Sequence, residues 1–265
     1  MRLLRPIILC LPICLFVGCI EQTKLENSPA FDSGLSEYLE PADELVESTP
    51  KHLMSVDTNN GIVYQIDPKN GTAVEISSVS TEHQISTMDI NDEGVAYVYD
   101  HATQQIGILD PCTGELNLLP EVNTEYVICG MSFDNNGALY ALDSKEDLLL
   151  SFNLETGQAT PIGSLEMDIS ACGLAYDAQS NRLFGATAST GRVFTIDKNT
   201  GATFNHSQTT VPFVSVGLEY EKETDSLITS TGAELFSVEH DDGTSTFVGS
   251  LRGDIDDLVY HPGCW

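Results

Sequence analysis

Short runs of apolar and β-branched residues follow one another through most of this chain, and most runs end at glycine, asparagine or aspartate. Ile62–Ile66, Leu148–Phe152 and Leu235–Val238 are typical. Their short length and their content of Val, Ile, Phe and Tyr predict β-strands, because helices show longer stretches with a 3.6-residue period. The polar breaks predict hairpin turns, since Gly, Asn and Asp adopt the backbone conformations of tight turns. The pattern therefore predicts an all-β protein.

One turn pattern recurs five times, starting at a polar residue and ending four positions later at glycine. The copies are Asp67–Gly71, Asp110–Gly114, Asn153–Gly157, Asp197–Gly201 and Glu239–Gly243. Their glycines are 43, 43, 44 and 42 residues apart. A strand-rich period of about 40–50 residues is typical of β-propellers, in which each repeat forms one blade. The glycine supplies the positive φ that a bulged hairpin needs.

Each repeat contains four strand-like runs, of which the first two precede the turn by some distance. In the third repeat these two are Cys129–Asp134 and Leu139–Leu142. The first repeat lacks the first run, and a matching run stands at the end of the chain, Asp256–His261. We expect this strand to pair with Leu53–Val56, because that closes the ring and removes two unpaired edges. The predicted fold is a five-bladed β-propeller of four-stranded antiparallel blades over residues 51–265.

Aromatic residues recur at one position of the innermost strands: Phe133, Tyr176, Tyr220 and, in the closing strand, Tyr260. Both faces of a blade meet neighbouring sheets, so a side chain at this position is predicted to pack between blades. We interpret it as a structural position and not as a platform on which a ligand stacks.

The N-terminal sequence has the order of an export signal. Met1–Arg5 is basic, and Ile7–Val17 is apolar but too short to span a bilayer. Phe16–Cys19 resembles the bacterial lipobox, with Phe16 where leucine is usual. The resemblance implies a lipoprotein signal peptide over residues 1–18 and a lipid, such as palmitate, on Cys19. The alternative is an ordinary secretory signal, and both predict export.

Residues 19–50 read as a flexible acidic tether, because Ser, Pro, Asp and Glu dominate and no period persists. Together with a lipid on Cys19, this segment predicts a protein held to a membrane of the cell envelope, at the outer membrane or the periplasmic face. Its partners are then the membrane and another envelope protein or a cationic ligand.

The chain carries 40 acidic and 11 basic residues, for a formal net charge of −29. Such a surface repels nucleic-acid phosphates and anionic lipid head groups, which excludes nucleic acid as a partner. Two interpretations stay open: the charge keeps the protein soluble and monomeric, or it attracts cations and basic partners.

Four cysteines remain beyond the export signal and Cys19, an even number that suits an oxidising compartment. Cys129 and Cys172 start equivalent inner strands of adjacent repeats, whereas Cys112 and Cys264 both fall on the opposite face. This face rule predicts the disulfides Cys129–Cys172 and Cys112–Cys264. The alternative is four buried thiols, and no cysteine or histidine spacing indicates zinc.

The chain lacks the short motifs of serine hydrolases, zinc proteases, P-loop enzymes and EF-hands. No histidine pair has ligand spacing, and the acidic loops, such as Asp57–Gly61 and Asp134–Gly137, have turn chemistry of their own. These loops also offer too few oxygen atoms for calcium. The sequence therefore predicts no catalytic residue, no cofactor and no metal site. The histidines are His52, His83, His101, His206, His240 and His261.

Carboxylates that precede inner strands are the most promising candidates for a site. Asp168, Asp254, Asp256 and Asp257 are expected to crowd one mouth of the central channel, and the alternative is a set of solvated loops.

The segments Gly137–Asp143, Ser151–Gly157 and Ala159–Gly163 are similar to bacterial propellers of the quinoprotein-amine-dehydrogenase-like and YVTN-type group. The resemblance implies the propeller fold and little about activity, because its motif is structural. Two classes of function follow. The first is a non-enzymatic, surface-anchored binding or scaffold module. The second is a lyase or hydrolase that uses carboxylates or a metal at one mouth of the channel.

Overall fold

The structure is a computed structural model that describes residues 52–120, 126–253 and 255–264. Residues 1–51 lie outside the described residues, and with them the predicted signal peptide, Cys19 and the whole predicted tether. Among the described residues there is no helix, and therefore none long and apolar enough to cross a bilayer.

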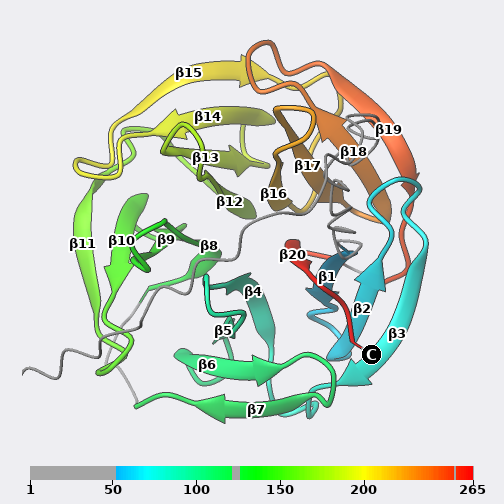
Figure 1. The fold of residues 1–265 in the computed structure, drawn as a ribbon. Helices are drawn as coiled ribbons and strands as arrows, with labels where there is room; N and C mark the ends of the chain where they lie inside the picture. The colour runs from blue at the N-terminus through cyan, green and yellow to red at the C-terminus, as the bar shows by residue number, and fades with distance from the viewer. Residues whose placement is uncertain (1–51, 121–125, 254, 265) are drawn as a thin grey trace, which may run out of the picture. The chain divides into compact units, whose positions relative to one another are not determined.

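Residues 52–264 form the predicted five-bladed propeller, in which every blade is a four-stranded antiparallel sheet (Figure 1). Blade 1 consists of β20 (Val259–His261), β1 (His52–Val56), β2 (Ile62–Ile66) and β3 (Ala73–Ser78). Blade 2 consists of β4 (Ile85–Ile90), β5 (Ala96–Asp100), β6 (Gln105–Asp110) and β7 (Glu115–Leu118). Blade 3 consists of β8 (Ile128–Phe133), β9 (Leu139–Asp143), β10 (Leu148–Phe152) and β11 (Ala159–Ser164).

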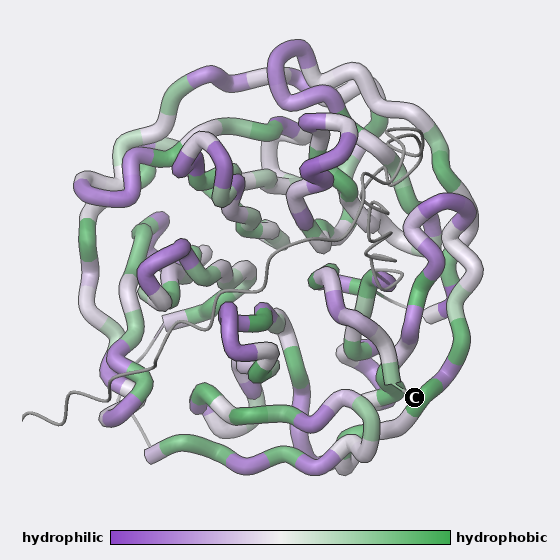
Figure 2. The backbone as a smooth tube through the Cα atoms, in the orientation of Figure 1, coloured by the Kyte–Doolittle hydropathy of each residue, from purple (hydrophilic) through white to green (hydrophobic). Residues whose placement is uncertain are grey.

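Blade 4 consists of β12 (Cys172–Asp177), β13 (Arg182–Thr187), β14 (Arg192–Ile196) and β15 (Thr203–Gln208). Blade 5 consists of β16 (Gly217–Glu221), β17 (Ser226–Thr231), β18 (Glu234–Val238) and β19 (Ser245–Ser250). In each blade the first strand named faces the centre and the last forms the rim (Figure 1). Hydrophobic residues recur along the strands, and hydrophilic residues gather in the turns (Figure 2).

Closure by the C-terminal strand is confirmed, over a shorter segment than predicted. β20 pairs antiparallel with β1 through three residue pairs: His52 with His261, Leu53 with Tyr260, and Met54 with Val259. Ahead of β20, an isolated bridge joins Asp57 to Ile255. The first blade therefore combines strands from both ends of the propeller sequence.

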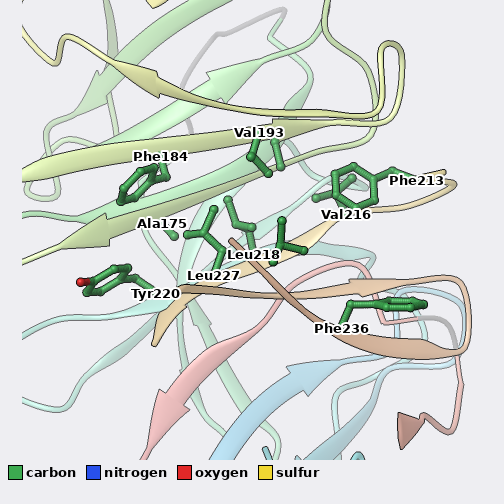
Figure 3. Packing of buried hydrophobic residues seen from close by; sticks show 11 residues of the cluster. Ala175, Phe184, Val193, Phe213, Val216, Leu218, Tyr220, Leu227 and Phe236 are labelled. Atoms are coloured by element: carbon green, nitrogen blue, oxygen red, sulfur yellow. The ribbon is translucent and has the colours of Figure 1, made fainter. Parts of the chain in front are cut away.

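Five apolar clusters fill the five interfaces between neighbouring blades. The cluster between blades 4 and 5 contains Phe184 and Val193 from one blade and Leu218 and Tyr220 from the other (Figure 3). The core therefore lies between the blades, and each blade is stabilised by both of its neighbours.

The repeated aromatic position lies at these interfaces, as predicted. Phe133 of β8 packs edge-to-face on Tyr97 of β5, with ring centroids 5.2 Å apart. Tyr220 of β16 stacks on Phe184 of β13 at 6.0 Å. Tyr176 of β12 packs against the apolar cluster between blades 3 and 4, and Lys198 of its own blade lies over its ring, with Nζ 5.1 Å from the centroid.

Tyr260 of β20, at the same aromatic position, donates its hydroxyl to the carboxylate of Glu221. Glu221 ends β16, so this hydrogen bond joins blade 1 to blade 5.

The glycine of the recurring turn has a second role beyond its positive φ. Gly201 has φ +78°, and a Cβ atom on it would lie 2.7 Å from the backbone of Gly163, in the outer strand of the preceding blade. A Cβ on Gly114 would lie 2.1 Å from the carbonyl oxygen of Ser78, and one on Gly243 would lie 2.2 Å from that of Gln208. The turn of each of these blades thus packs directly on the rim strand of the blade before it.

Candidate functional site: the mouth of the central channel

A hollow of about 560 Å³ opens where the inner strands begin. All five blades contribute to its wall: Thr58 and Asp256 from blade 1, Ser86 from blade 2, Ser144 from blade 3, Ala171 from blade 4 and Ser215 from blade 5. These residues meet because equivalent strand ends of a ring of similar blades converge on its axis. The repeat architecture therefore builds one shared cavity from five similar loops.

The wall of this hollow is mostly uncharged. Hydroxyl and amide groups alternate with aliphatic ones, and Val214 stands out because its side chain is 70% exposed. Thr58 Oγ1 is 2.9 Å from both the carbonyl oxygen of Ile85 and the Oδ2 atom of Asp256. This arrangement gives the Asp256 carboxylate a hydrogen-bonding neighbour at the mouth and ties blade 1 to blade 2.

Both predicted disulfides are present. Cys129–Cys172 lies in the wall of the hollow and joins blades 3 and 4, with a Cα–Cα distance of 5.1 Å. Cys112–Cys264 joins the β6–β7 turn of blade 2 to the chain just after β20, with a Cα–Cα distance of 5.4 Å. Each disulfide therefore links two blades, and the first one fixes the shape of the mouth.

Below the mouth, Asp257 is buried in the channel wall, with 4% of its surface exposed. Its carboxylate accepts hydrogen bonds from the backbone N–H of Met88, at 2.7 Å, from the backbone N–H of Leu258, and from the hydroxyl of Thr87. Desolvation by burial raises the pKa of Asp257 well above its usual value. This corrects the alternative of a solvated loop for Asp257: the side chain is buried against β4, where the backbone N–H of Met88 needs an acceptor.

Two more carboxylates, Asp89 and Glu219, repeat this arrangement deeper in the channel. Asp89 of β4 accepts the backbone N–H groups of Ile90 and of Phe133 in β8. Glu219 of β16 accepts those of Tyr220 and of Tyr260 in β20. Each carboxylate therefore bridges its own strand to the next inner strand around the ring.

The surroundings of these two side chains disfavour their charged forms. Burial raises the pKa of Asp89 to about 7, against the opposing effect of the N–H donors. Burial also raises the pKa of Glu219 well above its usual value, and the nearby Asp89 charge adds to that. Both residues are half-buried. The inner wall therefore carries three carboxyl groups that bind protons far more readily than exposed ones do.

The predicted mouth carboxylates fall in different places. Asp256 lines the hollow, and Asp257 lies below it. Asp168 is exposed, and its carbonyl oxygen accepts the hydroxyl of Ser189. Asp254 lies outside the described residues.

Sequence reasoning missed Asp89 and Glu219. The available signal was their position: both fall where the equivalent inner strands have Ser132 and Ala175. An acidic residue inside an otherwise apolar strand needs a local partner, and here the partner is the edge of the next strand.

The acidic turns have the internal hydrogen bonds of Asx-turns. Asp57 accepts the N–H of Asn59 at 2.9 Å, and Asp134 accepts that of Asn136 at 2.9 Å. Asp134 also binds Lys198 of blade 4, with Nζ 2.7 Å from Oδ2. Across residues 52–264, apart from the undescribed gaps, no group of three or more His, Cys, Asp and Glu side chains is arranged to hold a metal ion.

No protein-family profile matches this chain, and no curated protein matches it in sequence. Among solved structures, a chain of a nidogen/laminin complex is similar with a TM-score of 0.57 at 12% identity, over 81% of this chain and 100% of that one. A protein of unknown function from Bacteroides thetaiotaomicron has a TM-score of 0.53 at 13% identity, over 78% of this chain and 65% of that one. At these identities the similarity establishes the propeller fold and does not extend to activity.

Proposed function

We propose that this protein is a binding module of the bacterial cell envelope, held to a membrane through lipid on Cys19, and that its ligand enters the hollow at the channel mouth. One observation carries the proposal: a cavity of about 560 Å³ to which all five blades contribute. Its size falls in the range of ligand pockets, about 300–1,000 Å³. The disulfide Cys129–Cys172 in its wall keeps the shape fixed before a ligand arrives, which lowers the entropic cost of binding.

The lining indicates the chemistry of the ligand. Val127, Val214 and Val216 offer aliphatic surface, and neighbouring hydroxyl groups offer donors and acceptors. Asp256 adds one carboxylate at the rim, and the chain as a whole is strongly acidic. A chain end or loop of an envelope protein, with aliphatic side chains and a neutral or basic character, fits this wall. An anionic ligand does not.

The alternative function is a lyase or hydrolase, and the pKa of Asp89 near 7 is the observation that favours it. A group that titrates near neutral pH is suited to general acid–base catalysis. Against this, Asp89, Glu219 and Asp257 each bridge two strands through backbone N–H groups, and none of them lines the hollow. We therefore assign the three carboxylates to the closure of the ring and the hollow to binding.

The experiment compares two matched valines on the full-length chain. Val214 at the mouth is 70% exposed, and Val74 on the outer strand β3 is 60% exposed. Envelope extract is passed over immobilised wild-type, Val214→Asp and Val74→Asp proteins, and the retained proteins are identified by mass. We expect a partner that wild type and Val74→Asp retain and Val214→Asp loses. Equal retention by all three proteins would place the interaction elsewhere.

A further inference from the structure

The two disulfides of this protein differ in their surroundings. In the first disulfide, Cys172 is buried, with 1% of its surface exposed, and Cys129 is half-buried and lines the mouth hollow. Cys112 is exposed in the turn between β6 and β7, and Cys264 is half-buried. Cys112 is therefore the most exposed of the four cysteines, and access is one determinant of thiol–disulfide exchange.

A second hollow, of about 330 Å³, lies directly beside the exposed disulfide. Its wall includes Cys112 itself, together with Asp110, Glu115, Asn117 and His261. It lies on the face of the ring opposite to the mouth, because it is formed where inner strands end and where the third strand of blade 2 turns into the fourth. This hollow leaves room beside the Cys112 sulfur for an incoming reactant.

The bond between Cys112 and Cys264 holds the seam of the ring. β20 is only three residues long and pairs with β1 through three residue pairs. After β20, the backbone N–H of Cys264 donates to Gln65 of blade 1 at 3.4 Å, and its side chain packs on the apolar cluster between blades 1 and 2. The disulfide then fixes this segment covalently to blade 2 across a sequence separation of 152 residues.

We propose that Cys112–Cys264 is a site of thiol–disulfide exchange with a dithiol reductant, and that its reduction frees the closing strand β20 while the other blades stay folded. A thiolate of the reductant attacks Cys112 Sγ, the Cys112–Cys264 bond breaks, and Cys264 leaves as a thiolate that takes a proton from water. The second thiolate of the reductant then attacks the reductant sulfur that is bonded to Cys112. Cys112 leaves as a thiolate and takes a proton from water. Two electrons pass to the protein, and the reductant becomes a disulfide.

The hollow also selects the reductant by charge. The backbone N–H of Cys112 donates to the Asp110 carboxylate, at 2.9 Å, and holds the pKa of that carboxyl below its usual value. Asp110 is therefore charged at neutral pH, and Glu115 lies in the same wall. These two carboxylates attract a cationic thiol and repel an anionic one, and they have little effect on a neutral thiol.

The first test follows reduction in the folded, full-length protein. Dithiothreitol is added without denaturant, free thiols are trapped with N-ethylmaleimide at successive times, and labelled peptides are identified by mass. We expect Cys112 and Cys264 to be labelled at least about tenfold faster than Cys129 and Cys172, because attack at the exposed Cys112 frees both thiols of that disulfide. Labelling of all four cysteines together, or of Cys129 and Cys172 first, would overturn the proposal.

The second test measures the consequence by hydrogen exchange. We expect reduction to raise exchange in β20 and β1, and the double variant Cys112→Ser/Cys264→Ser to show the same change without reductant. The double variant Cys129→Ser/Cys172→Ser is the control and leaves β20 protected. Unchanged protection of β20 after complete reduction of Cys112–Cys264 would contradict the proposal that this disulfide holds the closing strand in place.

A third comparison tests the charge selection. Cysteamine and mercaptoethanesulfonate are small thiols of similar size and opposite charge. At equal thiolate concentration, we expect cysteamine to reduce Cys112–Cys264 faster than mercaptoethanesulfonate does. In the double variant Asp110→Asn/Glu115→Gln, we expect the two reduction rates to be closer to each other. An equal rate for both thiols on the wild-type protein would overturn selection by this hollow.

Discussion

Asp89 of blade 2 accepts the backbone N–H of Phe133 of blade 3. In the same way, Asp257 accepts the backbone N–H of Met88, and Glu219 accepts that of Tyr260. Three carboxyl groups therefore join four inner strands that follow one another around the ring, in the order β16, β20, β4 and β8. Inner strands of a propeller have one unpaired edge, and buried N–H groups on that edge need acceptors. Here side chains from the neighbouring blade provide them.

This bridging predicts how stability depends on pH. The pKa of Asp89 is raised to about 7 in the folded protein, above about 3.9 in the unfolded chain. The folded state therefore binds more protons, so the stability from this group is full below about pH 4 and is lost as the pH rises through 7. Because Asp89 is half-buried and partly screened, we expect a loss of about 1–3 kcal/mol.

The measurement is urea unfolding of wild type and Asp89→Asn between pH 5 and pH 8. The variant cannot ionise at this position, so its stability is expected to fall less over this range. Parallel pH profiles for the two proteins would show that Asp89 does not hold its proton in the folded state.

The repeated aromatic position predicts a large effect of truncation. Phe133 is 7% exposed and packs on Tyr97 across a blade interface. Phe133→Ala should lower the free energy of unfolding by about 3–5 kcal/mol, the usual cost of removing a buried ring. The control is Phe204→Ala on the rim, where the ring is 45% exposed and the expected cost is below about 1 kcal/mol. Similar unfolding midpoints in urea for both variants would contradict the packing.

A pair of glycines separates backbone strain from contact between blades. Gly137 and Gly201 have φ of +74° and +78°, but a Cβ on Gly137 would meet no atom within 4 Å. Gly137→Ala should therefore cost about 1 kcal/mol, from strain alone. Gly201→Ala adds the clash with the backbone of Gly163 and should cost at least about 2 kcal/mol more. Equal melting shifts for the two variants would show that the turn does not press on the neighbouring blade.

The fold was largely predictable from the sequence, because the five turns repeat at a nearly constant period and the missing first strand reappears at the C-terminus. The same repeat placed Cys129 and Cys172 at equivalent positions of adjacent blades, and this decided both disulfide pairings. The carboxyl groups of Asp89 and Glu219 were not predictable in this way. Their role depends on which backbone N–H groups a neighbouring blade leaves unpaired, and that needs the relative position of two sheets.

The close contact between Gly201 and Gly163 was missed for a related reason. A glycine in a turn is fully explained by its positive φ, so nothing in the local sequence points to a neighbour. The mouth hollow combines one predicted carboxylate, Asp256, with hydroxyl and valine residues that carry no motif. Such a site forms where loops from five blades converge, so no single segment of the sequence predicts it.

The anchor on Cys19 stays a prediction from the sequence, and fractionation tests it. Cys19→Ser removes the only thiol that the lipobox resemblance assigns to lipid. We expect the variant to move from the membrane pellet to the soluble exported fraction, while Cys112→Ser/Cys264→Ser stays in the pellet. Sedimentation of Cys19→Ser with membranes in detergent-free buffer would exclude lipid as the attachment.

Photo-cross-linking in intact membranes tests the binding site at the mouth most directly. A photoreactive phenylalanine analogue replaces Val214 at the mouth in one full-length variant and Val74 on the rim in another, two positions of similar exposure. We predict a discrete cross-linked product at position 214 and none at position 74. A product at position 74 alone, or products of equal yield at both positions, would contradict the assignment of the hollow as the binding site.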